Sequence, residues 1–262
     1  MEVDKVIDHI VKWLKDYANN AKVNGFVIGV SGGIDSAVTS TLCAKTGLPT
    51  LCIVLPIHQA ENQVNRANEH IKQLMERFSN VTTTEVNLTD TFESFKEAVP
   101  KTNTSSKKDL ALANTRARLR MTTLYYFAGL HGLLVTGTGN KVEDFGVGFF
   151  TKYGDGGVDL SPIADLLKSE VYELAANLNV PVSIKQAKPT DGLFGDSRTD
   201  EDQIGASYDE LEWAMDMQHI GKTIENFTGR EAEVYKIYTR LNHINQHKMK
   251  PIPICLIPKE LK

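Results

Sequence analysis

Residues 29–36 have the sequence GVSGGIDS and continue the apolar run FVI. An apolar run of this length predicts a buried strand, which ends near Ser31. The glycine pair that follows permits a tight bend and a close approach of the backbone to a ligand. Asp35 then opens a helix, whose free N–H groups and macrodipole attract an anion. The stretch therefore predicts a strand, turn and helix that together can hold a phosphate.

Strand and helix patterns alternate on both sides of this unit. Residues 3–17 carry apolar side chains at helical spacing, and residues 50–56 (TLCIVLP) form a second apolar run. A polar helix over 59–78 and a strand over 81–88 (VTTTEVNL) complete the first half. Runs that are apolar on both faces are typical of a parallel sheet covered by helices. We predict an α/β fold: a doubly wound, mainly parallel sheet with helices on both faces.

The second half adds a helix, a strand and two long loops. Residues 110–130 predict a helix and LLVTGT, at 133–138, another buried strand. Residues 137–157 contain seven glycines, which predicts a long irregular loop of the kind that is usually functional. The polar stretches 101–109 and 181–206 are predicted as a loop or helix lead-in and as a second long loop. Additional helices are predicted at 166–178, 208–217 and 230–245.

Composition limits the classes of function. The chain has 262 residues, 41% hydrophobic and 24% charged, with a net charge of −4. This favours one globular domain over 1–262 and gives no attraction to nucleic acid. The three cysteines lack C-x-x-C spacing, the N-terminus lacks the order of a secretory signal, and no apolar run approaches the roughly 20 residues of a membrane span. We expect a soluble, cytoplasmic protein.

Taken alone, the glycine pair is also compatible with a plain strand-to-helix turn in which Asp35 or Ser36 caps the helix. The loop lacks both the lysine of a Walker A motif and the G-x-G-x-x-G of a dinucleotide-binding turn. A loop that holds the two terminal phosphates together suits attack at the α-phosphorus, with AMP and pyrophosphate as products.

Longer blocks carry a family resemblance. SGGIDS closely resembles the pyrophosphate loop of the N-type ATP pyrophosphatases, whose fold is adenine nucleotide alpha hydrolase-like. ALANTRARLRM, GTGNKVEDFGVGFFTKYGDGGVDLSPIADLLKSEVYELA and KPTDGL, in that order, resemble blocks of the ammonia-dependent NAD synthetases. The resemblance covers roughly residues 1–250. It implies a ligase that converts nicotinic acid adenine dinucleotide (deamido-NAD) to NAD with ATP and ammonia.

The resemblance also assigns residues. It implies an ATP site formed by Gly29, Val30, Ser31, Gly32, Gly33, Ile34, Asp35, Ser36, Thr138, Lys168 and Thr190. It implies Mg²⁺ on Asp35 and Glu143, which agrees with the preference of Mg²⁺ for carboxylate oxygens. It implies deamido-NAD contacts from Arg118, Lys152, Asp159, His247 and Lys248. Without the resemblance, Glu143, Lys168 and His247 are also compatible with solvated surface positions.

One block departs from the commoner family pattern. GTGNKVEDFGVGFF stands where a GTDHAAE-type start is usual, and it is one residue longer between Glu143 and Phe149. The residues remain identifiable, but their geometry is a question for the structure.

The resemblance extends to the nitrogen donor and the assembly. Only about 25 residues precede the first predicted strand, so we expect no glutaminase domain and free ammonia as donor. Family members are homodimers, and the stripe Tyr125, Tyr126 and Phe127 could be either interface or core. The alternatives are another N-type pyrophosphatase ligase and a non-catalytic nucleotide-binding protein, which would bind ATP without turnover.

Overall fold

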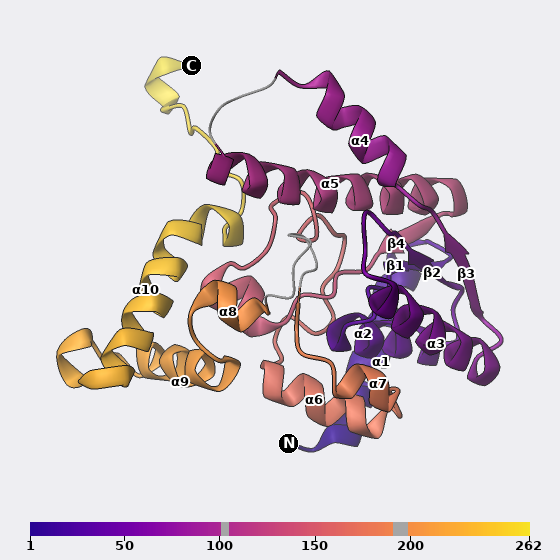
Figure 1. Ribbon diagram of the computed structural model, residues 1–262, viewed down its shortest axis with the longest axis horizontal. Helices are drawn as coiled ribbons and strands as arrows, with labels where there is room; N and C mark the ends of the chain where they lie inside the picture. Colours follow the sequence, from indigo (N-terminus) through magenta and orange to yellow (C-terminus); the bar gives the residue numbers. More distant parts are fainter. Residues whose placement is uncertain (101–104, 191–198) are drawn as a thin grey trace.

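The computed structural model describes residues 1–100, 105–190 and 199–262. Within them, four strands form one sheet in the order β3-β2-β1-β4, with all neighbouring pairs parallel (Figure 1). The strands are β1 (Gly25–Gly29), β2 (Thr50–Val54), β3 (Val81–Glu85) and β4 (Leu133–Val135). The predicted α/β class with a parallel sheet is therefore confirmed.

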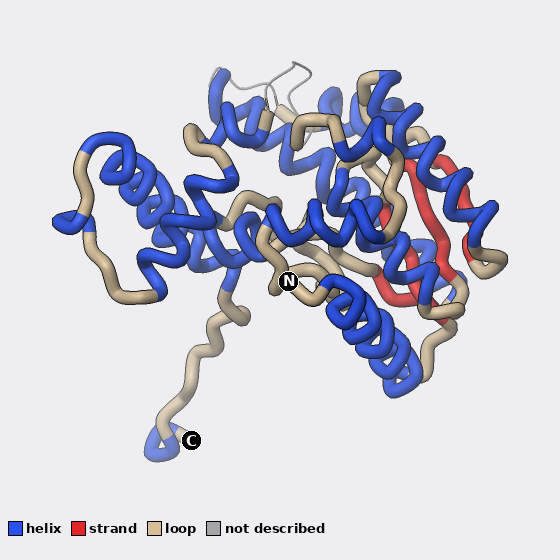
Figure 2. Tube along the Cα trace, turned by 90° about the horizontal axis from the view of Figure 1, so that it is seen from below, coloured by secondary structure: helices blue, strands red, loops and turns tan. Residues whose placement is uncertain are grey.

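Helices account for most of the remaining chain (Figure 2). Those before β4 are α1 (Val3–Ala21), α2 (Ile34–Lys45), α3 (Glu61–Arg77), α4 (Thr89–Ala98) and α5 (Ser105–His131). Those after it are α6 (Lys168–Asn177), α7 (Val182–Lys185), α8 (Asp200–Ile204), α9 (Tyr208–His219) and α10 (Gly229–Met249). Short helical turns lie at η1 (Val142–Val147), η2 (Ile224–Asn226) and η3 (Lys259–Leu261).

The central strand β1 shows why both faces of the sheet are covered. Successive side chains of a strand point to opposite faces. Phe26 packs with α1, α2 and α6, and Ile28 packs with α2 and α3. Val27 points the other way, into a cluster with α4 and α5. The continuous apolar run in the sequence follows from this burial on both sides, and the doubly wound arrangement is confirmed.

The C-terminal helices form a second cluster beside the sheet. Residues of η1, α8, α9 and α10 pack together around Leu211, Val234 and Tyr238. Figure 1 shows these helices at the opposite side of the molecule from β3. Their position leaves the carboxyl ends of β1 and β4 facing the space between the sheet and this cluster, which is where ligands bind in open parallel sheets.

Two loop predictions need correction, and the open alternative for residues 101–109 is decided in part. Residues 105–109 are the first turn of α5, because a helix can extend beyond its apolar stripe, where periodicity gives no signal. The predicted loop 181–206 contains α7 and α8, and α8 begins with a capping box from Thr199 to Asp202. The glycine-rich segment 137–157 contains a π-helix, η1. Residues 101–104 and 191–198 of these loops lie outside the described residues.

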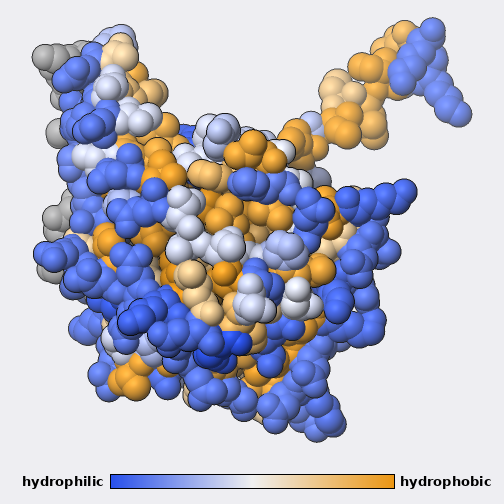
Figure 3. Space-filling view, turned by 90° about the vertical axis from the view of Figure 1, so that its right-hand side faces the viewer, coloured by the Kyte–Doolittle hydropathy of each residue, from blue (hydrophilic) through white to orange (hydrophobic). Residues whose placement is uncertain are grey.

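The proline-rich tail is extended, as expected, and stands away from the body. Figure 3 shows it as an apolar arm. Ile254 and Leu256 are 79% and 84% exposed. Among the described helices, none is long and apolar enough to cross a membrane.

Candidate active site

The glycine loop lies tightly against α3. Gly32 has φ of +80°, in the left-handed region that favours glycine. A Cβ built there would lie 2.5 Å from the carbonyl oxygen of Gln63. The Ser36 hydroxyl accepts a bond from the backbone N–H of Ser31 and donates to the Gly33 carbonyl. The bend is therefore held by its own polar contacts and by the close approach of a neighbouring helix.

A cavity of about 290 Å³ opens at this loop. Its lining includes every residue that was expected to bind ATP: the loop residues 29–36 together with Thr138, Lys168 and Thr190. These residues come from four separate segments of the chain. The cavity lies at the carboxyl ends of the parallel strands, because the loop directly follows β1 and Thr138 lies just after β4.

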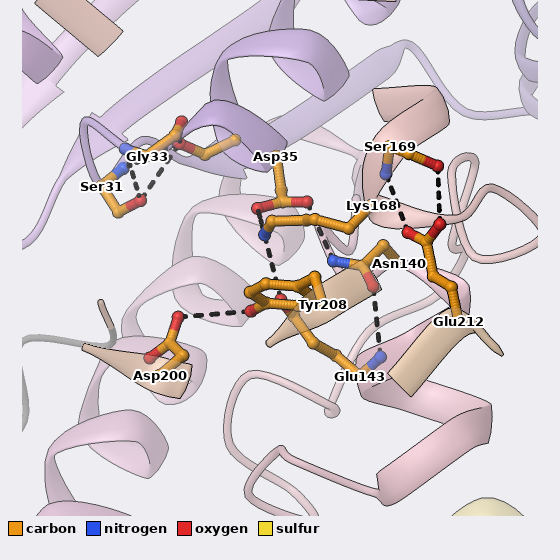
Figure 4. A network of polar contacts seen from close by, with 11 residues as sticks. Ser31, Gly33, Asp35, Asn140, Glu143, Lys168, Ser169, Asp200, Tyr208 and Glu212 are labelled. Carbon is orange, nitrogen blue, oxygen red and sulfur yellow. Dashed lines mark hydrogen bonds and ion pairs between the residues drawn. The ribbon is translucent and has the colours of Figure 1, made fainter. Parts of the chain in front are cut away.

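Lys168 joins the two carboxylates that were expected to bind magnesium (Figure 4). Its Nζ lies 2.6 Å from Asp35 Oδ2 and 3.0 Å from Glu143 Oε1. The lysine side chain is only 3% exposed, so the contact is protected from solvent. The structure thus brings the first residue of α6, the N-terminal turn of α2 and the π-helix η1 together at the Lys168 ammonium.

Charge pairing decides the protonation of this triad. Burial alone would lower the pKa of Lys168, but the two carboxylates outweigh it and raise that pKa above its usual value. Burial would raise the pKa of Glu143, yet Lys168 and the Tyr208 hydroxyl hold it below its usual value. For Asp35, burial dominates and raises the pKa. Lys168 therefore stays charged and keeps Glu143 ionised.

Two uncharged residues fix the carboxylates in place. Asn140 is fully buried; its Nδ2 donates to Asp35 Oδ1 at 3.0 Å, and its Oδ1 accepts from the Glu143 N–H at 3.1 Å. The Tyr208 hydroxyl donates to Glu143 Oε1 at 2.6 Å, and its ring lies 4.7 Å from Lys168 Nζ. Neither role was predictable from the sequence, because each depends on segments far apart in the chain.

The carboxylate geometry fits a divalent cation. Asp35 and Glu143 converge on one positive group, the Lys168 ammonium, so their oxygens already face a common point. Among the described residues, no group of three or more His, Cys, Asp and Glu side chains could hold a metal alone. Mg²⁺ commonly uses one or two carboxylates and completes its shell with water and substrate phosphates. The pair fits such a shared site and does not form an all-protein cage.

The residues expected to contact deamido-NAD form a separate, connected group. Arg118 is exposed, and its Nη2 donates to the Lys152 carbonyl at 3.3 Å. Lys152 Nζ donates to the His247 carbonyl, and Lys248 Nζ donates to the Phe150 carbonyl at 2.6 Å. The loop before Gly154 and the end of α10 therefore meet beside α5. None of these four predicted contact residues lines the large cavity as described.

Asp159 has a different setting. Its Oδ2 accepts from the Val135 N–H at 2.8 Å, and its Oδ1 accepts from the Tyr125 hydroxyl at 2.9 Å. Both oxygens are thus used in anchoring the loop to β4 and α5. The contact also raises the pKa of Tyr125, after burial as the larger cause.

A smaller cavity of about 180 Å³ adjoins the first. Asp144 and Asp155 line both cavities, and Lys248 lines only the smaller one. Burial, followed by the charges of Glu143 and Asp155, raises the pKa of Asp144 to about 8. The Asp144 carboxylate occupies the place of a side chain at position 139, since a Cβ on Gly139 would lie 2.2 Å from its Oδ2.

Comparison with known proteins identifies the family. A family model described as NAD synthase matches residues 6–252. The chain belongs to the NAD synthase family.

Relatives of this family match along the whole chain. The NH(3)-dependent NAD(+) synthetase of Mesoplasma florum is 38% identical over 100% of this chain and 99% of its own. That of Methanosarcina mazei is 35% identical over 97% of this chain and 98% of its own.

Solved structures agree. An NMN synthetase from Francisella tularensis superposes with a TM-score of 0.82 at 33% identity, covering 99% of both chains. An NH3-dependent NAD synthetase from Campylobacter jejuni, at 24% identity and a TM-score of 0.78, shares the fold over 98% of this chain.

The parts of the site that could be predicted from the sequence are those that lie in family motifs. The loop and the blocks around Glu143, Lys152 and Lys168 are contiguous motifs, so they can be recognised one by one. Gln59 and Arg66 also line the large cavity, but they lie in ordinary helical or loop sequence without a motif.

Proposed function

We propose that this chain catalyses the ATP-dependent amidation of deamido-NAD by ammonia, giving NAD, AMP and pyrophosphate. The observation that carries the proposal is the cavity at the glycine loop, because the expected ATP residues from four segments line it together. Membership of the NAD synthase family supports the same reaction, as do the activities of the relatives from Mesoplasma florum and Methanosarcina mazei.

ATP is proposed to bind with its terminal phosphates in the loop 31–36. The backbone N–H groups at the start of α2 face this anion site, and the helix dipole adds to the attraction. Thr138 and Thr190 lie along the same cavity and offer hydroxyl groups to the nucleotide. Asp35 and Glu143 would hold Mg²⁺ in contact with the phosphates, and the bound ion would supply charge neutralisation for the triphosphate.

The chemistry is proposed to proceed through an acyl adenylate. The nicotinate carboxylate attacks the α-phosphorus, the bond to the bridging oxygen breaks, and pyrophosphate leaves. Ammonia then attacks the acyl carbon, and AMP leaves with the carboxylate oxygen that joined it to the acyl group. Lys168 lies beside Asp35 and offers a fixed positive charge to the phosphates as charge develops on them. Positioning and charge neutralisation therefore carry the reaction, and no side chain forms a covalent bond.

The dinucleotide is proposed to contact the group formed by Arg118, Lys152, His247 and Lys248, together with Asp159. Arg118 and Lys152 supply positive charge for its phosphates beside α5. The backbone bonds that these side chains make with one another keep the loop and the end of α10 together. A bound dinucleotide would either replace these contacts or be added to them.

A second candidate substrate is the deamidated mononucleotide. The Francisella tularensis structure, which covers 99% of this chain at 33% identity, is described as an NMN synthetase. The two activities share the ATP site and the nicotinate chemistry and differ only in the remote adenylate half of the acceptor. We favour the dinucleotide because the relatives from Mesoplasma florum and Methanosarcina mazei are NAD(+) synthetases that match nearly full length.

A direct competition tests the choice. The protein would be incubated with ATP, Mg²⁺, ammonium and equal amounts of nicotinic acid adenine dinucleotide and nicotinic acid mononucleotide, and the products separated by chromatography. We expect NAD as the main amide product, with stoichiometric AMP and pyrophosphate. Predominant NMN would favour the second candidate, and ADP with orthophosphate would contradict both.

We further propose a cytoplasmic homodimer built from single-domain subunits of residues 1–262. Tyr126 and Leu130, one helical turn apart on α5, are 64% and 59% exposed, whereas Phe127 packs into the core. Within the aromatic stripe, Tyr126 is thus exposed, whereas Phe127 is part of the core. An outward apolar strip of this kind supports a contact between two copies.

A further inference from the structure

Arg66 belongs to α3 and lies beside the glycine loop. Its Nε donates to the Gly32 carbonyl at 3.3 Å, and its Cβ is 3.2 Å from the place of a Cβ on Gly32. The side chain is half-buried and lines the large cavity. Asp35, in the same loop, forms an ion pair with Lys168. Two cationic side chains, Arg66 and Lys168, therefore contact residues of this loop.

The cavity offers a triphosphate few cationic side chains. The described lining has four, Arg66, Arg120, Lys168 and Lys188, beside five acidic residues. Lys168 is engaged by two of those carboxylates, and Arg120 by the Leu55 carbonyl and Gln59. Bringing ATP into such a cavity requires cations that still have donors to give.

Arg66 meets that requirement. Within the described part of the chain, its two terminal nitrogens make no hydrogen bond, whereas its Nε is fixed by the Gly32 carbonyl. Anchoring at Nε orients the planar guanidinium, and a planar fork binds two oxygens of a phosphate at once. The anchor contacts the same loop whose N–H groups face the anion site, so the fork and the loop can share one ligand.

We propose that Arg66 binds the terminal phosphates of ATP, and the pyrophosphate formed from them, from the Gly32 side of the loop. This inference rests on the proposed function for the identity of the nucleotide. Arg66 would thus hold the pyrophosphate leaving group, a role distinct from that of Lys168. AMP, which lacks the terminal phosphates, gains nothing from Arg66.

The test compares ligands that do and do not carry those phosphates. Arg66→Gln and Arg66→Lys would be assayed for the KM of ATP and for inhibition by pyrophosphate and by AMP, with binding of Mg²⁺–pyrophosphate followed by calorimetry. We expect Arg66→Gln to weaken ATP and pyrophosphate about 10- to 100-fold, as for lost hydrogen bonds to a charged group, and to leave AMP inhibition and the KM of deamido-NAD unchanged. Arg66→Lys should lie between this variant and the wild type.

Lys72→Gln is the matched control, because Lys72 is an exposed cation on the same helix away from the cavity. It should match the wild type for all ligands. If Arg66→Gln binds pyrophosphate as tightly as the wild type, or weakens AMP equally, the proposal is wrong. The calorimetric arm does not need turnover, so a wild type that binds pyrophosphate through Arg66 but makes no NAD would refute the proposed function and leave this inference standing.

Discussion

At the scale of single residues, the decisive feature is the position of Lys168 between two acids. An ammonium with 3% exposure is stable only because Asp35 and Glu143 face it. The same arrangement concentrates opposite charges where the triphosphate is proposed to lie. A substitution here should therefore affect turnover more than folding only if the replacement keeps the hydrogen bonds of the original side chain.

Asp35→Asn keeps the shape of the side chain and only one of the two hydrogen bonds that Asp35 accepts, from Asn140 and Lys168. Asparagine retains the shape and one acceptor but loses the charge that Mg²⁺ and Lys168 use. We expect kcat/KM for ATP to fall by about 100-fold or more, with little change in the circular dichroism spectrum. Asp165→Asn is the control: Asp165 is 96% exposed, and its ion pair with Lys141 should contribute little. Residual activity of Asp35→Asn close to wild type would refute the metal role.

His70 supplies a prediction about pH. It is fully buried between α2 and α3, where its Nε2 lies 2.9 Å from the Ser40 hydroxyl. Burial, aided by the charge of Arg77, lowers its pKa to about 4 from 6.5. Between pH 6.5 and pH 4, the unfolded chain therefore binds a proton at His70 that the folded chain does not bind. The free energy of unfolding falls as the pH drops through this window.

The expected loss from His70 is roughly 3 kcal/mol between pH 6.5 and pH 4. Urea unfolding of the wild type and of His70→Gln at several pH values measures it. The difference between the two proteins should narrow toward pH 4, because the variant lacks this titration. Parallel curves for the two proteins across the window would show that His70 does not carry the effect.

At the scale of elements, the loop depends on its contact with α3. Gly32→Ala introduces both an unfavourable φ and a clash with the Gln63 backbone. Gly47→Ala introduces a similar φ, +76°, but has no atom within 4 Å of the new Cβ. We expect Gly47→Ala to cost about 1–2 kcal/mol in unfolding free energy with an unchanged KM for ATP.

Gly32→Ala should cost more than this and should also raise the KM for ATP, since the loop must move away from α3. Denaturant unfolding and initial-rate kinetics on both variants separate strain from steric exclusion. Equal losses of stability, with both KM values unchanged, would mean that the close packing has no part in phosphate binding.

The elements also show what the sequence could predict. The strands and the loop were predictable because local signals agree: apolar runs of strand length end at a glycine pair. The π-helix η1 was not, because its carbonyls are held by Asn242 and Asn245 of α10, almost 100 residues away. Its wide turn lies in the block that was expected to be one residue longer than the commoner pattern, and a π-bulge accommodates one extra residue. Glu143 thereby stays beside Lys168.

At the scale of the whole molecule, the single-domain proposal predicts cooperative unfolding. The cluster around Leu211 and Tyr238 is separate from the clusters at the sheet, but η1 and the Lys168 triad connect them. Scanning calorimetry should give one transition whose calorimetric and van't Hoff enthalpies agree. Two resolved transitions would show that the C-terminal helices unfold as an independent unit.

The dimer proposal is tested by mass. Sedimentation at micromolar concentration should show a species of twice 29.1 kDa. Introducing charge with Tyr126→Lys and Leu130→Lys together should shift it toward the monomer, because two like charges on each copy would face the contact. A fully active wild-type monomer would contradict the proposal.

The central claim is that the nicotinate carboxylate attacks the innermost phosphorus of ATP. It is tested most directly with deamido-NAD labelled with ¹⁸O in both carboxylate oxygens, by following the phosphorus products by ³¹P NMR and mass spectrometry. The account predicts one ¹⁸O in the phosphate of AMP for each NAD formed, and none in pyrophosphate. Unlabelled AMP, or label in orthophosphate alongside ADP, would contradict it.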